Sequence, residues 1–274
     1  MSAPLRLALL GATGRMGASL LQVLPGFPGL ALAAAVARAG HPQLGQDAGT
    51  AAGLAASGVP LSADLPAALA GVDLAIDFSS ASATAGHLRA CVAAQRPLLL
   101  GTTGLPDALQ ADLDRAAERI PLLVAANTSL GVALLAELVR RAAASLPDAY
   151  DIEIVETHHR AKIDAPSGTA LLLGAAATQG RGGRPDGRAE ARPMVHGPDA
   201  PVPRPRGAVG YASLRGGDVV GEHEVRFLGA GERLTLGHVA TDRAVFARGA
   251  LAAGEWLARQ PPGRYQLRDL FAEK

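Results

Sequence analysis

The chain has 274 residues, of which 49% are hydrophobic and 19% charged, a balance typical of folded globular proteins rather than disordered or fibrous ones. Its formal net charge is +1, with acidic and basic residues interspersed, so no long-range field favours nucleic acid or an anionic membrane. A single cysteine, Cys91, excludes an internal disulfide, and no apolar run is long enough to span a bilayer, so we expect a cytoplasmic protein with small-molecule partners.

The first half of the chain alternates short apolar runs with helical patterns, which is typical of parallel strands joined by crossover helices. The pattern predicts strands at 5–10, 30–36, 73–78, 97–100 and 122–125. It predicts helices at 16–24, 65–70, 82–94 and 106–119. Residues 40–58 are rich in Ala and Gly and carry no clear pattern. Together these elements predict an α/β fold with a Rossmann-type, doubly wound sheet.

The pattern changes after Asn127, where a second domain is expected to begin. A helix at 131–145, with Ser129 as its cap, precedes a strand at 150–157 and a helix at 167–178. Residues 179–207 are dense in Gly, Pro and Arg and predict an extended loop. Three strands then follow with the spacing of an antiparallel meander, at 210–214, 219–228 and 233–239, before a closing helix at 245–258.

A glycine-rich turn lies between the first predicted strand and the first predicted helix. It consists of Gly11, Ala12, Thr13, Gly14, Arg15, Met16 and Gly17. At this place the pyrophosphate of a dinucleotide meets free backbone amides, and glycine permits the close approach. The spacing is GxxGxxG rather than the commoner GxGxxG, and glycine turns after strands also occur for structural reasons alone. The turn therefore favours dinucleotide binding without proving it.

The end of the second predicted strand lacks the acidic residue that often binds the adenosine ribose. Ala37 and Arg38 follow Val36 there. A guanidinium matches the geometry of phosphate oxygens, so Arg38 can pair with a 2′-phosphate, which favours NADPH. A solvated arginine on a loop is an equally good interpretation of this residue alone.

The densest concentration of reactive side chains follows the strand predicted at 150–157. Between Glu156 and Thr169 lie two histidines, an arginine and a lysine, a cluster that an anionic substrate would balance. His158 or His159 is suited to proton transfer near neutral pH, and Lys162 would favour an anionic intermediate. Ser167 is a natural N-cap, so the amides that follow it can hold a carboxylate.

The alternative is that the paired histidines are metal ligands or surface residues. Adjacent strand residues point to opposite faces, and no HExxH spacing appears, so we expect catalysis and no metal. The remaining histidines have no comparable neighbours in sequence, and we expect them to be satisfied or solvated: His41, His87, His196, His223 and His238.

The segment EtHHraKiDaPSGTA, from Glu156 to Ala170, resembles the catalytic signature of dihydrodipicolinate reductases. Further matches occur in the same order along the chain: GatGRMG at 11–17, DFS at 77–79, GTTG at 101–104, AANtSlGV at 125–132 and GdvvGEHeV at 217–225. The resemblance covers essentially the whole chain.

The resemblance implies a dinucleotide-binding domain formed by residues 1–128 and 241–274. It also implies a substrate-binding domain over 129–240, with a mixed open sheet that builds a homotetramer. The implied reaction is reduction of 4-hydroxy-tetrahydrodipicolinate to tetrahydrodipicolinate by NADPH, with NADH possible, in the diaminopimelate route to lysine. Many relatives that use NADH well carry Glu where this chain has Ala37.

The resemblance further implies individual roles. His158 would donate the proton, with Lys162 as its partner in stabilising the transition state. The substrate carboxylates would be held by His159, Ser167, Gly168 and Thr169, and Thr103 would contact both ligands. Besides the 11–17 turn and Arg38, the cofactor would contact Gly101, Thr102, Thr103, Ala125, Ala126, Asn127, Arg243 and Phe246.

Two other functions are alternatives to this one. A reductase of the same architecture could act on another small anion, but an acylating semialdehyde dehydrogenase needs a thiolate, and Cys91 has no activating neighbours in sequence. A dinucleotide-binding sensor would have no need for His158 and Lys162 beside an anion cradle.

Overall fold

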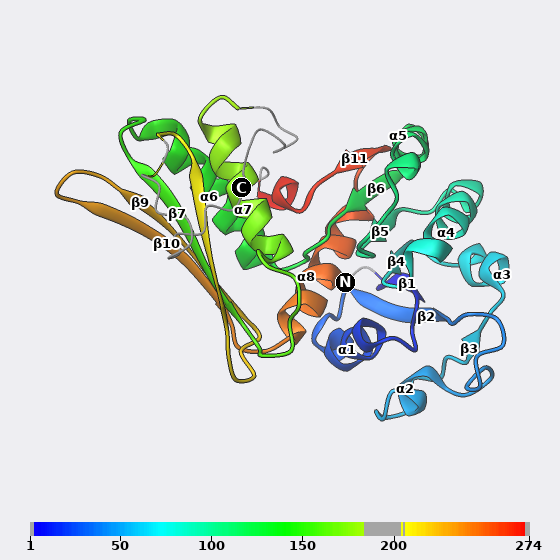
Figure 1. The fold of residues 1–274 in the computed structure, drawn as a ribbon. Coiled ribbons are helices and arrows are strands. Elements are labelled where there is room, and N and C mark those ends of the chain that lie inside the picture. The colour runs from blue at the N-terminus through cyan, green and yellow to red at the C-terminus, as the bar shows by residue number, and fades with distance from the viewer. Residues whose placement is uncertain (1–2, 184–203, 205, 272–274) are drawn as a thin grey trace. The chain divides into compact units, whose positions relative to one another are not determined.

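A computed structural model describes residues 3–183, 204 and 206–271 (Figure 1). The chain divides into two compact units, one formed by 1–130 with 244–274 and the other by 131–243. Most of the loop predicted at 179–207 lies outside the described residues. Within the described part, no helix combines the length and apolar character needed to cross a membrane.

The first unit contains a parallel sheet with the strand order β11-β6-β5-β4-β1-β2-β3. Its strands are β1 (Leu5–Leu10), β2 (Leu30–Val36), β3 (Leu61–Ser62), β4 (Leu74–Asp77), β5 (Leu98–Leu100), β6 (Pro121–Val124) and β11 (Gly263–Tyr265). The order reverses direction between β1 and β4, which is the switch point where open α/β sheets bind ligands. The predicted doubly wound sheet is therefore confirmed.

Helices cover both faces of this sheet. Ala8, Leu10 and Ala75 pack toward one face, which carries α3 (Leu65–Ala70), α4 (Ala81–Ala94) and α5 (Gln110–Ala117). The other face carries α1 (Arg15–Val23) and α8 (Ala244–Leu257). Gly254 allows α8 to approach β4, since a Cβ there would lie 2.9 Å from side-chain carbons of Leu74 and Ile76.

Several short elements of this unit were not predicted. They are α2 (Ala48–Ala51), β3, β11 and the 3-10 turns at Leu24–Gly26 and Leu267–Phe271, while the helix predicted at 106–119 begins with a 3-10 turn at Asp107–Leu109. The strand β3 has only two residues and α2 only four, too few to show a period in sequence.

The second unit contains a sheet with the order β10-β9-β7-β8. Its elements are α6 (Leu130–Ser145), β7 (Asp151–His158), α7 (Gly168–Gly180), β8 (Val209–Arg215), β9 (Gly221–Leu228) and β10 (Arg233–Ala240). Alternate strand residues such as Ile154 and Phe227 form one core with Val139 of α6 and Leu173 of α7. One face of the sheet is thus packed against helices, as the alternating burial along β7 requires.

The predicted antiparallel meander is wrong in one respect. Strands β9 and β10 are antiparallel neighbours, but β8 pairs in parallel with β7 and not with β9. The long crossover through α7 permits this parallel pairing. The segment that follows β8 then passes around the end of β7, where Gly216 N donates to His158 O over 2.9 Å. Strand β7 therefore lies between β8 and β9.

Candidate active site

The glycine turn of the first unit lies between β1 and α1. Gly11 has a φ of +82°, which favours glycine. A Cβ on Gly17 would lie 2.5 Å from the carbonyl oxygens of Gly11 and Ala12, so only glycine lets α1 pack this closely. Gly14 is the N-cap of α1 and has no side chain to cap it, and the first turn contains no acidic residue. The helix start is therefore suited to binding an anion.

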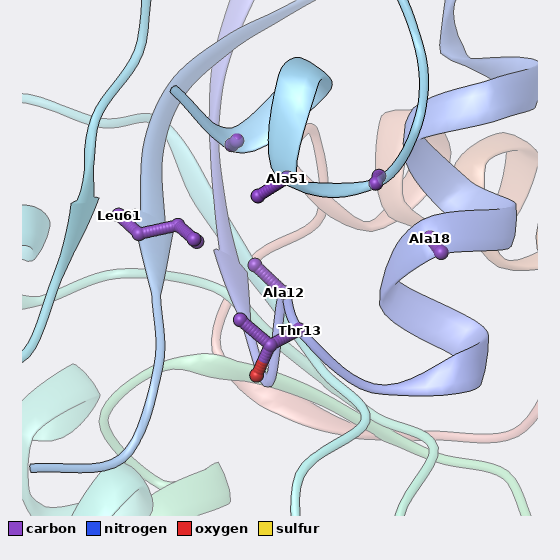
Figure 2. A pocket seen from close by; sticks show the side chains of 7 residues that line it. Ala12, Thr13, Ala18, Ala51 and Leu61 are labelled. Carbon is purple, nitrogen blue, oxygen red and sulfur yellow. The ribbon is translucent and has the colours of Figure 1, made fainter. Parts of the chain in front are cut away.

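Beside this turn lies a small pocket of about 50 Å³ (Figure 2). The residues that line it are Ala12, Thr13, Ala18, Ala48, Ala51, Ala52 and Leu61. Ordinary ligand sites have volumes of roughly 300–1,000 Å³, so this pocket is too small for a whole dinucleotide. Support for cofactor binding comes from the turn and not from this pocket.

Two more predicted segments lie at the same edge of the sheet, after β5 and β6. The Thr102 hydroxyl is buried and has no hydrogen-bond partner among the described residues, while Thr103 is exposed. Ala125 N donates to Leu100 O over 3.0 Å, which ties the two strand ends together. Backbone turns and an unpaired buried hydroxyl at the carboxyl edge of a parallel sheet fit a bound dinucleotide.

Helix α8 is attached to the end of β6. Thr128 Oγ1 donates to Phe246 O over 2.7 Å, and a Cβ on Gly249 would lie 1.8 Å from Thr128 O. Phe246 is therefore held in the first unit beside the segment that contains Ala126 and Asn127. Arg243 belongs to the second unit, and its role stays a prediction.

Arg38 follows β2 directly and is exposed, with no ion-pair partner in the described part of the chain. Ala37 is buried, and its N–H donates to Ser62 O over 2.9 Å. Neither residue 37 nor residue 38 is acidic, so the charged side chain at the end of β2 is the cation Arg38.

The second unit gathers charged side chains at the end of β7. Alternation along the strand places Glu156 and His158 on its helix-covered side. Glu156 is 1% exposed; one of its oxygens lies 2.5 Å from His158 Nδ1. Arg215, at the end of β8, donates to both Glu156 oxygens over 2.8 Å and to Asp164 O over 2.7 Å. The carboxylate is therefore held by a bidentate arginine and a histidine.

These contacts set the protonation states. Burial favours the neutral acid, but hydrogen bonds from Arg215, Ser213 and His158 hold the pKa of Glu156 at about 2. Burial lowers the pKa of His158, and Glu156 opposes that effect only in part. An ionised carboxylate only accepts hydrogen bonds, so Nδ1 of His158 carries the proton. Its Nε2 lies toward Gly221, where a Cβ would be 3.1 Å away, and glycine thus leaves room beside this nitrogen.

Ser167 connects the helix start to this cluster. Its Oγ caps α7 by accepting from Ala170 N over 3.2 Å, and its own N–H donates to Glu156 over 3.2 Å. The same Oγ lies 3.1 Å from His223 Nε2. The Ser167 hydroxyl can donate to His223 Nε2 or accept from it, according to the tautomer of the histidine. The predicted N-cap is confirmed.

His223 corrects an expectation, since none of its neighbours in sequence grouped it with the reactive cluster. It is 5% exposed, its ring packs edge-on against His158 at 5.0 Å, and burial lowers its pKa to about 4. Alternation along β9 puts His223 on the same side as Gly221 and Phe227, which is the signal that could have found it. Arg215 was also missed. Of the other histidines, His87 has an acidic partner and His196 lies outside the described residues.

The remaining predicted residues surround this cluster. Lys162 Nζ contacts both oxygens of Asp164 at 2.8 and 2.9 Å, and its charge contributes to the lowered pKa of His158. His159 is half-buried just beyond β7, and Gly168 and Thr169 form the first turn of α7. Within the described residues, no group of three or more His, Cys, Asp or Glu side chains is arranged to hold a metal ion.

A Rossmann-type unit with an uncapped glycine turn, together with a second unit that has a buried carboxylate–histidine pair beside a helix start, fits the class of dinucleotide-dependent oxidoreductases that act on small molecules. Residues 5–128 match the family described as "Dihydrodipicolinate reductase, N-terminus" and residues 131–271 match "Dihydrodipicolinate reductase, C-terminus". The chain belongs to the dihydrodipicolinate reductase family, and it is an NAD(P)H-dependent oxidoreductase.

Full-length relatives agree with this assignment. The chain is 49% identical over 270 residues to a 4-hydroxy-tetrahydrodipicolinate reductase of Methylocella silvestris, covering 97% of both chains. It is 46% identical over 267 residues to the reductase of the same name from Anaeromyxobacter dehalogenans, again covering 97% of both. A solved dipicolinate-bound dihydrodipicolinate reductase from Paenisporosarcina sp. TG-14 has the same fold, with a TM-score of 0.77 at 22% identity, over 97% of this chain and 99% of that one. The family and the fold class predicted from sequence are confirmed.

Proposed function

We propose that the cluster at the end of β7 transfers the proton in the reduction of 4-hydroxy-tetrahydrodipicolinate to tetrahydrodipicolinate, the reaction of this family in the diaminopimelate route to lysine. The observation that carries the proposal is the Glu156–His158 contact of 2.5 Å, buried beside the N-terminus of α7. A general acid must be oriented and must sit beside the group that binds the substrate.

Glu156 and Arg215 prepare His158 for this role. The carboxylate holds the Nδ1 proton, so Nε2 is the nitrogen available to the substrate. In the ligand-free protein the lowered pKa of His158 favours the neutral ring. A dicarboxylate bound nearby would raise that pKa, because opposite charge favours the imidazolium, and His158 would then hold the proton to be donated.

The substrate carboxylates would be held by the amides of Gly168 and Thr169 with the Ser167 side chain, and by His159. These amides are at a helix start, where partial positive charge favours anions. Lys162 would leave Asp164 for the substrate and stabilise developing negative charge. Residues 129–240 would thus form the substrate-binding domain.

The nicotinamide dinucleotide would be held in the first unit, with its pyrophosphate on the 11–17 turn. The nicotinamide end would be held by residues that follow β5 and β6 and by residues near the start of α8. They are Gly101, Thr102, Thr103, Ala125, Ala126, Asn127, Phe246 and Arg243. Loss of water from the 4-hydroxy substrate would first give the conjugated imine. The bound cofactor would supply a hydride for C4 of this imine, and His158 would protonate the resulting enamine. Thr103 would contact both ligands, since donor and acceptor must meet on one substrate.

We further propose that NADPH is preferred to NADH. The support is that Arg38 is exposed and has no ion-pair partner among the described residues, and that residue 37 is not a carboxylate. A 2′-phosphate would pair with the guanidinium, while an acidic residue at this corner would repel it.

We also propose a cytoplasmic homotetramer assembled through the second unit. No described helix of that unit packs on the second face of its sheet, where Leu214 and Val239 are exposed. An uncovered sheet face with apolar residues is suited to pairing with another copy of the chain.

The first experiment generates the substrate in situ from pyruvate and aspartate semialdehyde with a dihydrodipicolinate synthase, and follows NADPH and NADH oxidation separately. We expect turnover with both and a higher kcat/KM with NADPH. Arg38→Ala should lower kcat/KM for NADPH about tenfold and leave NADH unchanged, because one charge-assisted contact is worth roughly 1.5–3 kcal/mol. No turnover in a protein that binds dinucleotide would contradict the reaction, and equal loss with both cofactors would contradict the role of Arg38.

A further inference from the structure

A second buried carboxylate–histidine pair lies in the first unit, apart from the residues given a role above. Asp77 is the last residue of β4 and is fully buried. Its Oδ2 lies 2.8 Å from Nδ1 of His87 on α4, and its Oδ1 accepts from Ser79 N over 2.8 Å. Ser79 Oγ is 3.3 Å from the same His87 nitrogen. A buried carboxylate requires such partners, because desolvation otherwise penalises its charge.

The neighbouring Cys91 does not stabilise the negative charge of Asp77. Cys91 lies one helical turn beyond His87, and burial together with the charge of Asp77 raises the pKa of its thiol to about 12. That thiol stays protonated and uncharged. Among described side chains, His87 is the one that hydrogen-bonds to the Asp77 carboxylate.

The turn attached to Asp77 lies against both backbone segments proposed to hold the dinucleotide. Phe78 N donates to Leu10 O over 3.1 Å, and a Cβ on Gly11 would lie 2.8 Å from Phe78 O and Ser79 Cα. On the other side, a Cβ on Gly101 would lie 2.3 Å from the Phe78 ring. Phe78 and Ser79 thus fill the space between the first glycine turn and the 101–104 turn. A shift of either residue would displace both turns.

We propose that His87 is a positioning residue for the nicotinamide dinucleotide. Through Asp77 it holds Phe78 and Ser79 in place, and these residues keep the backbones at Gly11 and Gly101 in the binding arrangement. The inference rests on the proposed role of the first unit in cofactor binding. The competing explanation is that His87 only stabilises α4 against the sheet.

The test compares variants of the full chain by two measurements: the Kd for NADPH, from nicotinamide fluorescence, and the melting temperature of the ligand-free protein. His87→Ala should raise the Kd about tenfold, since one hydrogen bond to a charged group is worth roughly 1.5–3 kcal/mol. Its kcat at saturating NADPH should stay within about twofold. His87→Asn keeps a donor near the position of Nδ1 and should restore the Kd to within about threefold of wild type.

Leu88→Ala is the matched control, because Leu88 is the next residue of α4, is buried in the apolar core and carries no group that could hydrogen-bond to Asp77. It should lower the melting temperature at least as much as His87→Ala while leaving the Kd unchanged. Asp77→Asn removes the charge of the other member of the pair and should raise the Kd for NADPH as His87→Ala does.

Three outcomes would overturn the proposal. A wild-type Kd in both His87→Ala and Asp77→Asn would remove the positioning role. An equal rise in Kd in Leu88→Ala would mean that general stability is responsible. Failure of the wild-type chain to bind either NADPH or NADH would instead overturn the cofactor assignment of the first unit, and this inference with it.

Discussion

The proposed binding edges of the two units differ in the chemical groups that they present. The edge of the first unit presents mainly backbone: Gly14 begins α1 without a capping side chain, and Gly17 lies against carbonyl oxygens. The edge of the second unit presents side chains, with Glu156, His158 and Arg215 held together by buried hydrogen bonds. A backbone site is sensitive to added atoms and insensitive to pH. The activity of a charged side-chain site depends on pH and falls when one of its charges is removed.

The largest effect should come from the proton donor. His158→Gln is expected to lower kcat about 1,000-fold, because general acid catalysis contributes roughly 10²–10⁴-fold. The Kd for NADPH should stay within about twofold, since the backbone site is in the other unit. Lys162→Met should act in the same direction. Initial rates and fluorescence titration measure the two quantities, and wild-type turnover in either variant would remove that residue from the proposed site.

Acid should destabilise the second unit through His223. The unfolded chain protonates this residue near pH 6.5, whereas the folded protein keeps it neutral to about pH 4. Between these values the unfolded state binds more protons, so the free energy of unfolding falls as the pH drops from 6.5 to 4. The loss is up to about 3 kcal/mol at 1.36 kcal/mol per pKa unit. Lowered pKa values of His158 and His238 add to it.

Urea unfolding at several pH values measures this loss, and His223→Gln should flatten the dependence. Glu156 adds to this loss only below about pH 5, because its stabilisation is lost as the pH falls through 4.5 toward 2, so the range from 6.5 to 5 reports the histidines. A pH dependence that is unchanged in His223→Gln would rule out this source of acid sensitivity.

Removing the charge that orients His158 should have a smaller effect than removing His158. Glu156→Gln is expected to lower kcat about 100-fold, because the ring loses the acceptor that fixes its tautomer. Glu153→Gln is the matched control. Glu153 is on the same strand and is also paired with an arginine, Arg204, but it points to the opposite face. Equal losses in the two variants would show that strand stability is responsible.

The smallest effect should come from adding one carbon atom to the backbone site. Gly17→Ala places a Cβ 2.5 Å from the carbonyl oxygens of Gly11 and Ala12, which must move apart. We expect the Kd for NADPH to rise about tenfold, equivalent to roughly 1.4 kcal/mol. Gly26→Ala, at a glycine with no atom within 4 Å of an added Cβ, should bind normally. Unchanged binding in Gly17→Ala would mean that the turn does not hold the cofactor.

Local patterns predicted much of the first unit and part of the site. The first strand, predicted at 5–10, is observed at those residues, and Ser167 caps α7 as its position before an apolar run indicated. Arg215 and His223 could not be found in the same way, because they are 59 and 56 residues from the partners they contact. Alternation along β9 marks His223 as inward-facing, but its contacts and those of Arg215 depend on strand pairing that no local spacing encodes.

The incorrect prediction of an antiparallel meander has the same cause. Three strand-like runs separated by short turns favour hairpins, and β9 with β10 does form one. Whether β8 pairs with β7 or with β9 depends on which apolar faces are buried together. Packing of α7 under β7 brings β8 to the parallel edge, where His158 is opposite Arg215 in the register.

By itself the sequence determined the elements whose hydrogen bonds join residues close in the chain: the strand, glycine turn and helix at the start, and the capped helix after His158. It also determined the family, through motifs spread along its length. Only the tertiary structure decided that Arg215 and His223 join Glu156 and His158, and that His87 meets Asp77. The physical reason is that these contacts follow from burial of whole faces of sheets and helices, a property of many distant residues at once.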